Sequence, residues 1–272
     1  MAMIELGTTD SPTRFTLAVT PPLCVGPPGQ QFLFGGAGLG SAVAALEAST
    51  GRPTVWATAQ YLSFARPPAV LDLDVVVPVS GRYSSQARVT GHVGDAEIFT
   101  VNAALGSRPG ALTMQWAAMP DVPPPGDCAP MRFDWPRNPD DLNSRFEQRI
   151  AHGRYGAERN TGGPSPDGAS AMWVRLAAGG SVDRVTLALM ADFVPSGIGH
   201  AVGAAMGGNS LDNTIRFLDV VPTEWVLCDT HIEGLAGGFG HGRMRLFAES
   251  GALLATASQS MIIRAHTPPV AG

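Results

Sequence analysis

A hairpin pattern that occurs twice constrains the fold of this chain more than any other feature. Residues 82–105 and residues 241–264 both alternate polar and apolar side chains on either side of a tight turn, as β-hairpins do. Superposing the hairpins places Ala103 of the first on Gln259 of the second, a shift of 156 residues. One unit used twice in a chain of 272 residues predicts two similar halves.

Gln259 is a polar residue on an otherwise apolar strand face. Because side chains alternate along a strand, it shares that face with Leu253, Ala255, Ala257, Met261 and Ile263. A buried amide needs partners, since leaving it unpaired costs about 1–3 kcal/mol. The first copy carries Ala103 at the same place, so the fold itself does not require an amide there. Gln259 is therefore either a satisfied core residue or part of a functional site, and the two interpretations are evenly balanced.

Each half is predicted to combine one helix with antiparallel strands. The first half has predicted strands at 13–20, 54–65, 70–79, 83–93 and 96–106 and a helix at 37–49. The second has a strand at 171–177, a helix at 181–192, a loop at 193–208 and a strand from Asn209, ahead of the second hairpin. Such a helix packs on the concave face of a curved sheet. We therefore predict an α+β fold with repeats at 1–110 and 144–272, joined by a proline-rich linker at 111–143.

Composition limits the partners that the chain can have. The net charge is −5, and arginines do not cluster, so nucleic acid and anionic membranes are not expected partners. The N-terminus lacks the pattern of a signal peptide, and no uninterrupted apolar run approaches the roughly 18 residues of a membrane span. The three cysteines are far apart in the sequence, which predicts reduced thiols in a cytoplasmic protein.

Asp192 is the second candidate for a functional residue. Val182, Val185, Leu189 and Asp192 recur at helical spacing, so a carboxylate closes an otherwise apolar stripe. The predicted helix, capped by Ser181, ends near Asp192, where the helix dipole disfavours a negative charge. Local rules tend to be broken at functional sites. The alternative is that the helix simply ends and Asp192 turns into solvent, and spacing alone slightly favours that alternative.

Several familiar motifs do not account for this chain. The glycine-rich stretch 34–40 precedes a helix, but its spacing and the antiparallel strands after it exclude a dinucleotide-binding fold. The amides at the start of that helix could still polarise an oxygen. The six histidines lack metal-ligand spacing, and no G-x-S-x-G motif marks a serine hydrolase. No metal or cofactor is expected.

At several motifs the sequence resembles the acyl-CoA thioesterase II family of double hotdog proteins. The matching stretches are FLFGGAG, AQYLSFARPP, RYSSQARVT, LALMADF, SLDNTIRF and ASQSMIIR, which together span most of the chain outside the linker. The resemblance implies two hotdog repeats and hydrolysis of acyl-CoA thioesters. It also implies association into dimers or larger homo-oligomers.

The family's catalytic pattern is a helix Asp, a Thr or Ser and a strand Gln, which correspond here to Asp192, Ser210 and Gln259. Ser210 rests on the resemblance alone. Gly35, Gly36 and Ala37 match the family's FGGQ motif and imply contacts with the substrate, although Ala37 replaces the glutamine. Asn213 stands where the family commonly has histidine. These two departures bear on the choice of substrate.

Two other functions remain open. Hotdog folds also host hydratases and dehydratases, which pair a helix Asp with a histidine, but no D-x-x-x-x-H pattern follows Asp192. The third interpretation is a lipid- or acyl-CoA-binding protein with a relic site. Release of CoA in a thiol-trapping assay would distinguish an enzyme from a binding protein.

Overall fold

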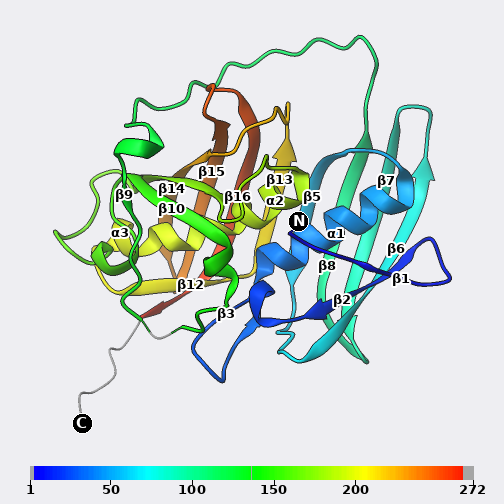
Figure 1. Cartoon of the computed structure of the whole chain (residues 1–272), viewed down its shortest axis with the longest axis horizontal. Coiled ribbons are helices and arrows are strands. Elements are labelled where there is room, and N and C mark those ends of the chain that lie inside the picture. The colour runs from blue at the N-terminus through cyan, green and yellow to red at the C-terminus, as the bar shows by residue number, and fades with distance from the viewer. Residues whose placement is uncertain (1–2, 136, 266–272) are drawn as a thin grey trace.

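The structure, a computed structural model, describes residues 3–135 and 137–265 and contains two halves side by side (Figure 1). Each half curves an antiparallel sheet around one helical stretch. The two sheets join edge to edge into a single sheet of 14 strands. This is the double hotdog arrangement that the repeated hairpin predicts.

The N-terminal half supplies six strands and the helix α1 (Gly35–Thr50). The strands are β1 (Gly7–Thr8), β2 (Arg14–Val19), β5 (Thr54–Tyr61), β6 (Ala69–Ser80), β7 (Ser84–Val93) and β8 (Ala96–Gly106), ordered β1-β2-β6-β7-β8-β5. A separate hairpin, β3 (Cys24–Val25) and β4 (Phe32–Leu33), leads into α1. The helix ends at Gly51, whose φ of 64° is the left-handed conformation that favours glycine.

The C-terminal half repeats this plan and has two more strands. Its strands are β9 (Ala129–Pro130), β10 (Phe146–His152), β11 (Ala169–Leu176), β12 (Met206–Ser210), β13 (Asp212–Phe217), β14 (Val226–Ala236), β15 (Phe239–Ala248) and β16 (Leu253–Ala265). The order is β13-β16-β15-β14-β11-β10-β9, and β12 pairs with β16 as well. Short 3-10 helices lie at η1 (Pro21–Leu23), η2 (Pro125–Asp127), η3 (Leu142–Arg145), η4 (Gly156–Glu158) and η5 (Ala191–Gly197).

The two halves meet where β5 pairs with β13. The strands are antiparallel, and Thr58 lies directly opposite Thr214. Their hydroxyl oxygens are 2.5 Å apart, and the two residues are 156 positions apart in the sequence. Residues related by the repeat can face one another only on a twofold axis, so an approximate twofold axis passes between these threonines.

The helix predicted at 181–192 begins later and continues further. α2 (Arg184–Met190), η5 and α3 (Ile198–Val202) follow one another without a break. Asp183, not Ser181, caps the start of α2 by accepting a hydrogen bond from the Thr186 amide at 2.7 Å. The Ser181 hydroxyl instead accepts from the Thr223 amide. The predicted loop at 193–208 is wrong, because these residues form η5, α3 and most of β12.

The same helical stretch is long and apolar enough to match a membrane span by composition. Of its most apolar 18-residue window within Arg184–Val202, 72% is buried inside the protein. A helix that is apolar on every side is expected at the centre of a core as well as in a membrane. Here the stretch is the central helix of the second half, enclosed by its sheet (Figure 1).

The segment between β8 and β10 crosses the top of the molecule in Figure 1 and is fixed at its far end. The Trp173 indole donates to the Pro123 carbonyl at 2.9 Å, and the Gln115 amide donates to the Gly251 carbonyl at 2.9 Å. The segment packs over a second apolar cluster on the outer face of the C-terminal sheet, formed by Cys128, Ala171, Trp173, Trp225, Leu227, Phe247 and Leu253.

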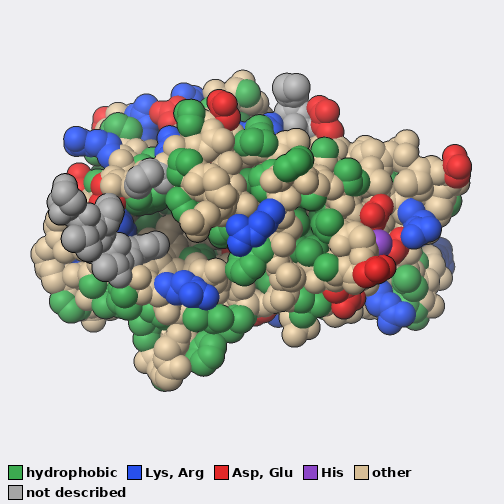
Figure 2. Space-filling model, turned by 90° about the horizontal axis from the view of Figure 1, so that it is seen from below, with side chains coloured by type: hydrophobic (Ala, Val, Ile, Leu, Met, Phe, Trp, Pro, Cys, Tyr) green, Lys and Arg blue, Asp and Glu red, His purple; other side chains and the backbone are tan. Residues whose placement is uncertain are grey.

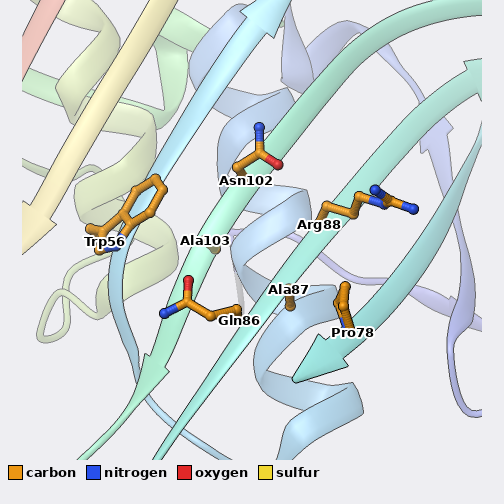
Figure 3. A pocket seen from close by; sticks show the side chains of 7 residues that line it. All are labelled: Trp56, Pro78, Gln86, Ala87, Arg88, Asn102 and Ala103. Carbon is orange, nitrogen blue, oxygen red and sulfur yellow. The ribbon is translucent and has the colours of Figure 1, made fainter. Parts of the chain in front are cut away.

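The outer face of the N-terminal sheet carries polar side chains among exposed apolar ones. Figure 3 shows Trp56, Gln86, Arg88 and Asn102 projecting from β5, β7 and β8 on the side away from α1. Ala103 is buried in the core on the helix side of the sheet. Its counterpart in the repeat, Gln259, is also buried. The core side therefore contains an amide in one half and a methyl group in the other.

Candidate active site

Asp192 lies in the core between the two halves and holds three hydrogen bonds. It is 4% exposed. One oxygen, Oδ1, accepts from the Ser210 hydroxyl at 2.8 Å and from the Gln259 amide. The other, Oδ2, accepts from the backbone N–H of Gly36 at 2.7 Å. The structure thus brings together Asp192, Ser210 and Gln259, the residues that match the family's catalytic pattern, and adds a backbone donor from the other half of the chain.

The contact between Asp192 and Gly36 depends on the twofold arrangement of the halves. Gly36 lies at the start of α1 in the first half and Asp192 directly after α2 in the second, so the bond joins the two halves. We expected the dipole of its own helix to disfavour a negative charge at Asp192. This expectation is wrong, because η5 and α3 continue the helical structure past it. Instead the carboxylate faces the N-terminal end of α1, which stabilises negative charge.

Only a glycine at position 36 allows this approach. A Cβ there would lie 2.5 Å from the Leu189 carbonyl oxygen and 2.9 Å from the Asp192 Cβ. Both distances are too short, and one of the atoms belongs to backbone that cannot rotate away. Gly36 therefore sets how closely α1 and α2 approach one another at the site.

We expect Gly36→Ala to lower both stability and turnover. Moving α2 away from α1 to make room costs about 1–3 kcal/mol and displaces the carboxylate. Thermal melting and hydrolysis rates of Gly36→Ala measure the two effects. Gly126→Ala is the matched control, because nothing lies within 4 Å of the Cβ that it adds. A Gly36→Ala variant with wild-type melting and turnover would show that the close contact is dispensable.

Ser210 owes its position to an irregularity in the strand that carries it. It was predicted to open a strand, but it closes β12, and β13 begins at Asp212. Both strands pair with β16, in registers that differ by one residue. The Asp212 carboxylate accepts the Ser260 amide at 2.8 Å, in place of a regular ladder bond. Such bulges re-aim side chains and are frequent beside active sites.

Gln259 points into the core from β16, as the alternation predicts. It is 3% exposed, and its Nε2 donates to Ser210 Oγ at 2.5 Å as well as to Asp192. Its carbonyl oxygen Oε1 has no partner among the described residues. One end of the amide thus orders the carboxylate and the hydroxyl, while the other is available as an acceptor.

The environment of Asp192 raises its affinity for a proton. Burial raises the pKa of Asp192 to about 6, even though hydrogen bonds from Ser210, Gln259 and Gly36, and the nearby Asn213 amide, favour the ionised form. The usual pKa of an aspartate is 3.8. A carboxylate whose pKa lies close to neutrality is suited to accept a proton in catalysis.

Two polar residues beside Asp192 were not predicted as members of the site. Asn213 is fully buried on β13, and neither its nitrogen nor its oxygen has a partner in the described part of the chain. Tyr61, at the end of β5, has a buried hydroxyl that is likewise unpartnered. Asn213 could have been found because it occupies the family's histidine position. Tyr61 carried no signal beyond its place in the AQYLSFARPP stretch.

The three residues of the glycine motif play different parts. The Gly36 N–H is occupied by Asp192, and the Ala37 N–H donates to the Phe34 carbonyl at 2.9 Å. Gly35 is the first residue of α1, so its N–H has no acceptor within the helix. A Cβ at Gly35 would lie 2.7 Å from Asp192 Oδ2. Gly35 therefore presents a backbone donor beside the carboxylate, whereas Ala37 is buried and its N–H is already used.

His200 and the cysteines belong to the structure of the core. His200 Nδ1 accepts from Arg154 Nε at 3.0 Å, and Nε2 lies 3.0 Å from the Ala169 carbonyl, which requires the neutral ring. Burial and the Arg154 charge lower the pKa of His200, in keeping with that state. The three cysteines are buried and unpaired. Within residues 3–135 and 137–265, no three His, Cys, Asp or Glu side chains gather as a metal site would require.

The chain matches a known protein family over the half that contains this site. The family described as the acyl-CoA thioesterase C-terminal domain matches residues 125–263, about half of the chain and the half that holds Asp192, Ser210 and Gln259. The chain belongs to the acyl-CoA thioesterase family. As a member of that family, the protein is a thioester hydrolase. No protein with a curated description matches it.

Solved structures agree with this assignment to the acyl-CoA thioesterase family. A protein from Novosphingobium aromaticivorans, provisionally named a thioesterase, is 36% identical over 94% of this chain and 97% of its own, with a TM-score of 0.85. A hot dog protein of unknown function from Alicyclobacillus acidocaldarius is 19% identical over 97% of each chain, with a TM-score of 0.83. An acyl-CoA thioesterase II, TesB2, from Mycobacterium marinum is 20% identical over 97% of this chain and 98% of its own, with a TM-score of 0.73. The last two comparisons show the shared fold.

Proposed function

We propose that this protein hydrolyses acyl-CoA to a free carboxylic acid and CoA by direct attack of water that Asp192 activates. The observation that carries the proposal is the buried carboxylate of Asp192, held by three donors and with a pKa raised to about 6. Its oxygens are fixed in place, and its proton affinity suits a general base. Membership of the acyl-CoA thioesterase family supplies the substrate class.

In this mechanism Asp192 accepts a proton from water as the water oxygen bonds to the thioester carbon. Ser210 and Gln259 orient the same water, with the unpartnered Gln259 Oε1 accepting its second hydrogen. The carbonyl electron pair moves onto oxygen, where the free N–H of Gly35 donates to it. When the tetrahedral intermediate collapses, the carbon–sulfur bond breaks, and the thiolate of CoA takes the proton from Asp192.

The loop that follows Tyr61 offers an apolar surface for the substrate. Figure 2 shows the molecule from below, where hydrophobic side chains are spread among polar ones. Leu62 and Phe64, in the loop directly after Tyr61, are among the exposed apolar residues of the protein. Phe64 packs edge-on against Phe32, with ring centroids 4.9 Å apart. An apolar surface next to Gly35 and Tyr61 suits an acyl group or the pantetheine arm.

The alternatives fit the site less well. Hydration or dehydration needs an acid partner for Asp192, but in the described part of the protein its hydrogen-bond partners are Ser210, Gln259 and Gly36, and none is a histidine. A binding protein with a relic site has no use for a buried carboxylate with a raised pKa, whose burial costs stability. Both observations favour hydrolysis.

A thiol-trapping assay across acyl-CoAs of increasing chain length tests the proposal. We expect stoichiometric release of CoA thiol and free acid from at least one chain-length class. Binding of a thioether analogue, which cannot be hydrolysed, is measured alongside. Tight binding of the analogue without release of CoA from any substrate would establish a binding protein instead.

The pH dependence of hydrolysis follows from the ionisation of Asp192. The base must be ionised, and its pKa in the folded protein is about 6. We therefore expect kcat/KM to fall tenfold per pH unit below about pH 6 and to level off above it, because kcat/KM reports the free enzyme. Rates measured from pH 5 to 8 check this. A flat profile across that range would mean that no group with such a pKa takes part.

A further inference from the structure

Tyr61 reaches the site from the first half of the chain. It is the last residue of β5, and its backbone N–H donates to the Leu211 carbonyl at 2.9 Å, directly after Ser210. A Cβ at Gly35 would lie 2.9 Å from Tyr61 Cζ and 2.7 Å from Asp192 Oδ2. The end of the phenol ring and the carboxylate thus flank the same point at the start of α1.

The hydroxyl of Tyr61 is buried but has no hydrogen-bond partner among the described residues. Buried tyrosine hydroxyls usually find one, since an unsatisfied buried polar group costs about 1–3 kcal/mol. Tyr155 shows the usual case, because its hydroxyl donates to Ser170 Oγ at 2.8 Å. An orphaned donor beside a reactive carboxylate indicates a partner that arrives with the substrate.

The donor of Tyr61 is not needed by Asp192. Ser210, Gln259 and Gly36 already donate to both carboxylate oxygens. Burial, together with the nearby charges of Asp192 and Asp212, raises the pKa of Tyr61 well above its usual value of 10. The phenol therefore keeps its proton around neutral pH, and its hydroxyl is available to donate a hydrogen bond.

We propose that the Tyr61 hydroxyl, with the N–H of Gly35, forms the oxyanion site for the thioester carbonyl. This inference rests on the proposed thioesterase function. When water attacks, the carbonyl π pair moves to oxygen, and the two donors hold the resulting negative charge while Tyr61 keeps its proton. When the carbon–sulfur bond breaks, the pair returns to form the product carbonyl. The first half of the chain thus supplies the oxyanion donors, and the second half supplies the base.

Tyr61→Phe tests this assignment because it removes the oxygen alone. Removing one donor of an oxyanion site costs about 10²–10³-fold in kcat. Because Gly35 remains, we expect kcat to fall by roughly a hundredfold, the lower end of that range. Binding of a thioether analogue of acyl-CoA, which has no carbonyl oxygen, should not change. Binding of a trifluoromethyl ketone analogue, which adds water at its carbonyl, should weaken by the same factor as kcat/KM. The melting temperature should stay the same or rise, because an orphaned buried hydroxyl is lost.

Two tyrosines serve as controls. Tyr155→Phe loses the bond to Ser170 and should lower the melting temperature without changing kcat. Tyr83→Phe, at an exposed position, should change neither. If kcat is unchanged in Tyr61→Phe, whatever its melting temperature, the oxyanion assignment is overturned while the thioesterase function stands. A wild-type protein that hydrolyses no acyl-CoA overturns the function itself.

Discussion

Asp192→Asn is expected to lower acyl-CoA turnover by about 10²–10⁴-fold, the contribution typical of a general base. The substitution keeps the shape of the side chain and removes its basicity. An amide at this position can still accept from Gly36 through one oxygen. Its new NH₂ group can donate to Gln259 if that amide flips, because Gln259 Oε1 has no partner among the residues that the structure describes. The loss should therefore be one of chemistry and not of folding.

The measurement is steady-state hydrolysis of several acyl-CoAs, with binding of the thioether analogue as a separate readout. Binding should change little, since the analogue does not need a base. Asp95→Asn, in the turn between β7 and β8, is the matched control and should leave turnover unchanged. If Asp192→Asn bound and turned over like wild type, Asp192 would not be the base.

The same variant should be more stable than wild type above about pH 6. The pKa of Asp192 is about 6 in the folded protein against 3.8 as its usual value, so between these values the native state holds more protons than the unfolded state. Stability of the wild type therefore falls as pH rises through that window, by about 3 kcal/mol in total. The Asp192→Asn variant has no ionisable group at this position, so its stability does not fall with pH in this window. Melting curves at pH 4.5 and pH 8 should show its advantage only at the higher pH.

Gln259→Ala is expected to lower turnover by about a hundredfold. Hydrogen bonds to charged groups are worth about 1.5–3 kcal/mol, and this amide donates to both Asp192 and Ser210. Losing a donor also raises the pKa of Asp192, so the acid limb of the pH profile should move to higher pH. The fold should persist, because Ala103 occupies the equivalent place in the first half.

Gln86→Ala is the matched control, since Gln86 also lies on a strand but on the outer face of the sheet (Figure 3). That variant should keep wild-type kcat and pH profile. Full activity in a well-folded Gln259→Ala protein would show that Gln259 is a packing residue only.

The parts of the site that follow from local sequence were predictable. Gln259 could be found because strand alternation fixes its face, and the internal copy with Ala103 shows that the fold does not demand an amide. Helical spacing put Asp192 at the end of an apolar stripe, although spacing alone slightly favoured a carboxylate turned into solvent; in the structure Asp192 is buried. One reason given for its importance, a helix end that disfavours its charge, was wrong in part: α2 ends at Met190, but η5 and α3 continue the helical stretch past Asp192.

The parts of the site that depend on tertiary structure were not predictable. The bond from Gly36 to Asp192 exists because the two halves pack around an approximate twofold axis, and no local pattern specifies that packing. Ser210 depends on a one-residue register shift against β16, which the strand pattern of NSLDNTIRF does not reveal. Tyr61 can be recognised as a candidate site residue only from the structure, in which its hydroxyl is buried and has no partner among the described residues.

The central claim is that water, activated by Asp192, attacks the thioester directly. A single turnover in H₂¹⁸O, with enzyme in excess over acyl-CoA, tests it most directly. Direct attack predicts that the first molecule of free acid carries one ¹⁸O and that the peptide containing Asp192 gains none. An acid without ¹⁸O, together with ¹⁸O in the Asp192 carboxylate, would mean that Asp192 forms an acyl-enzyme anhydride, and would contradict the account.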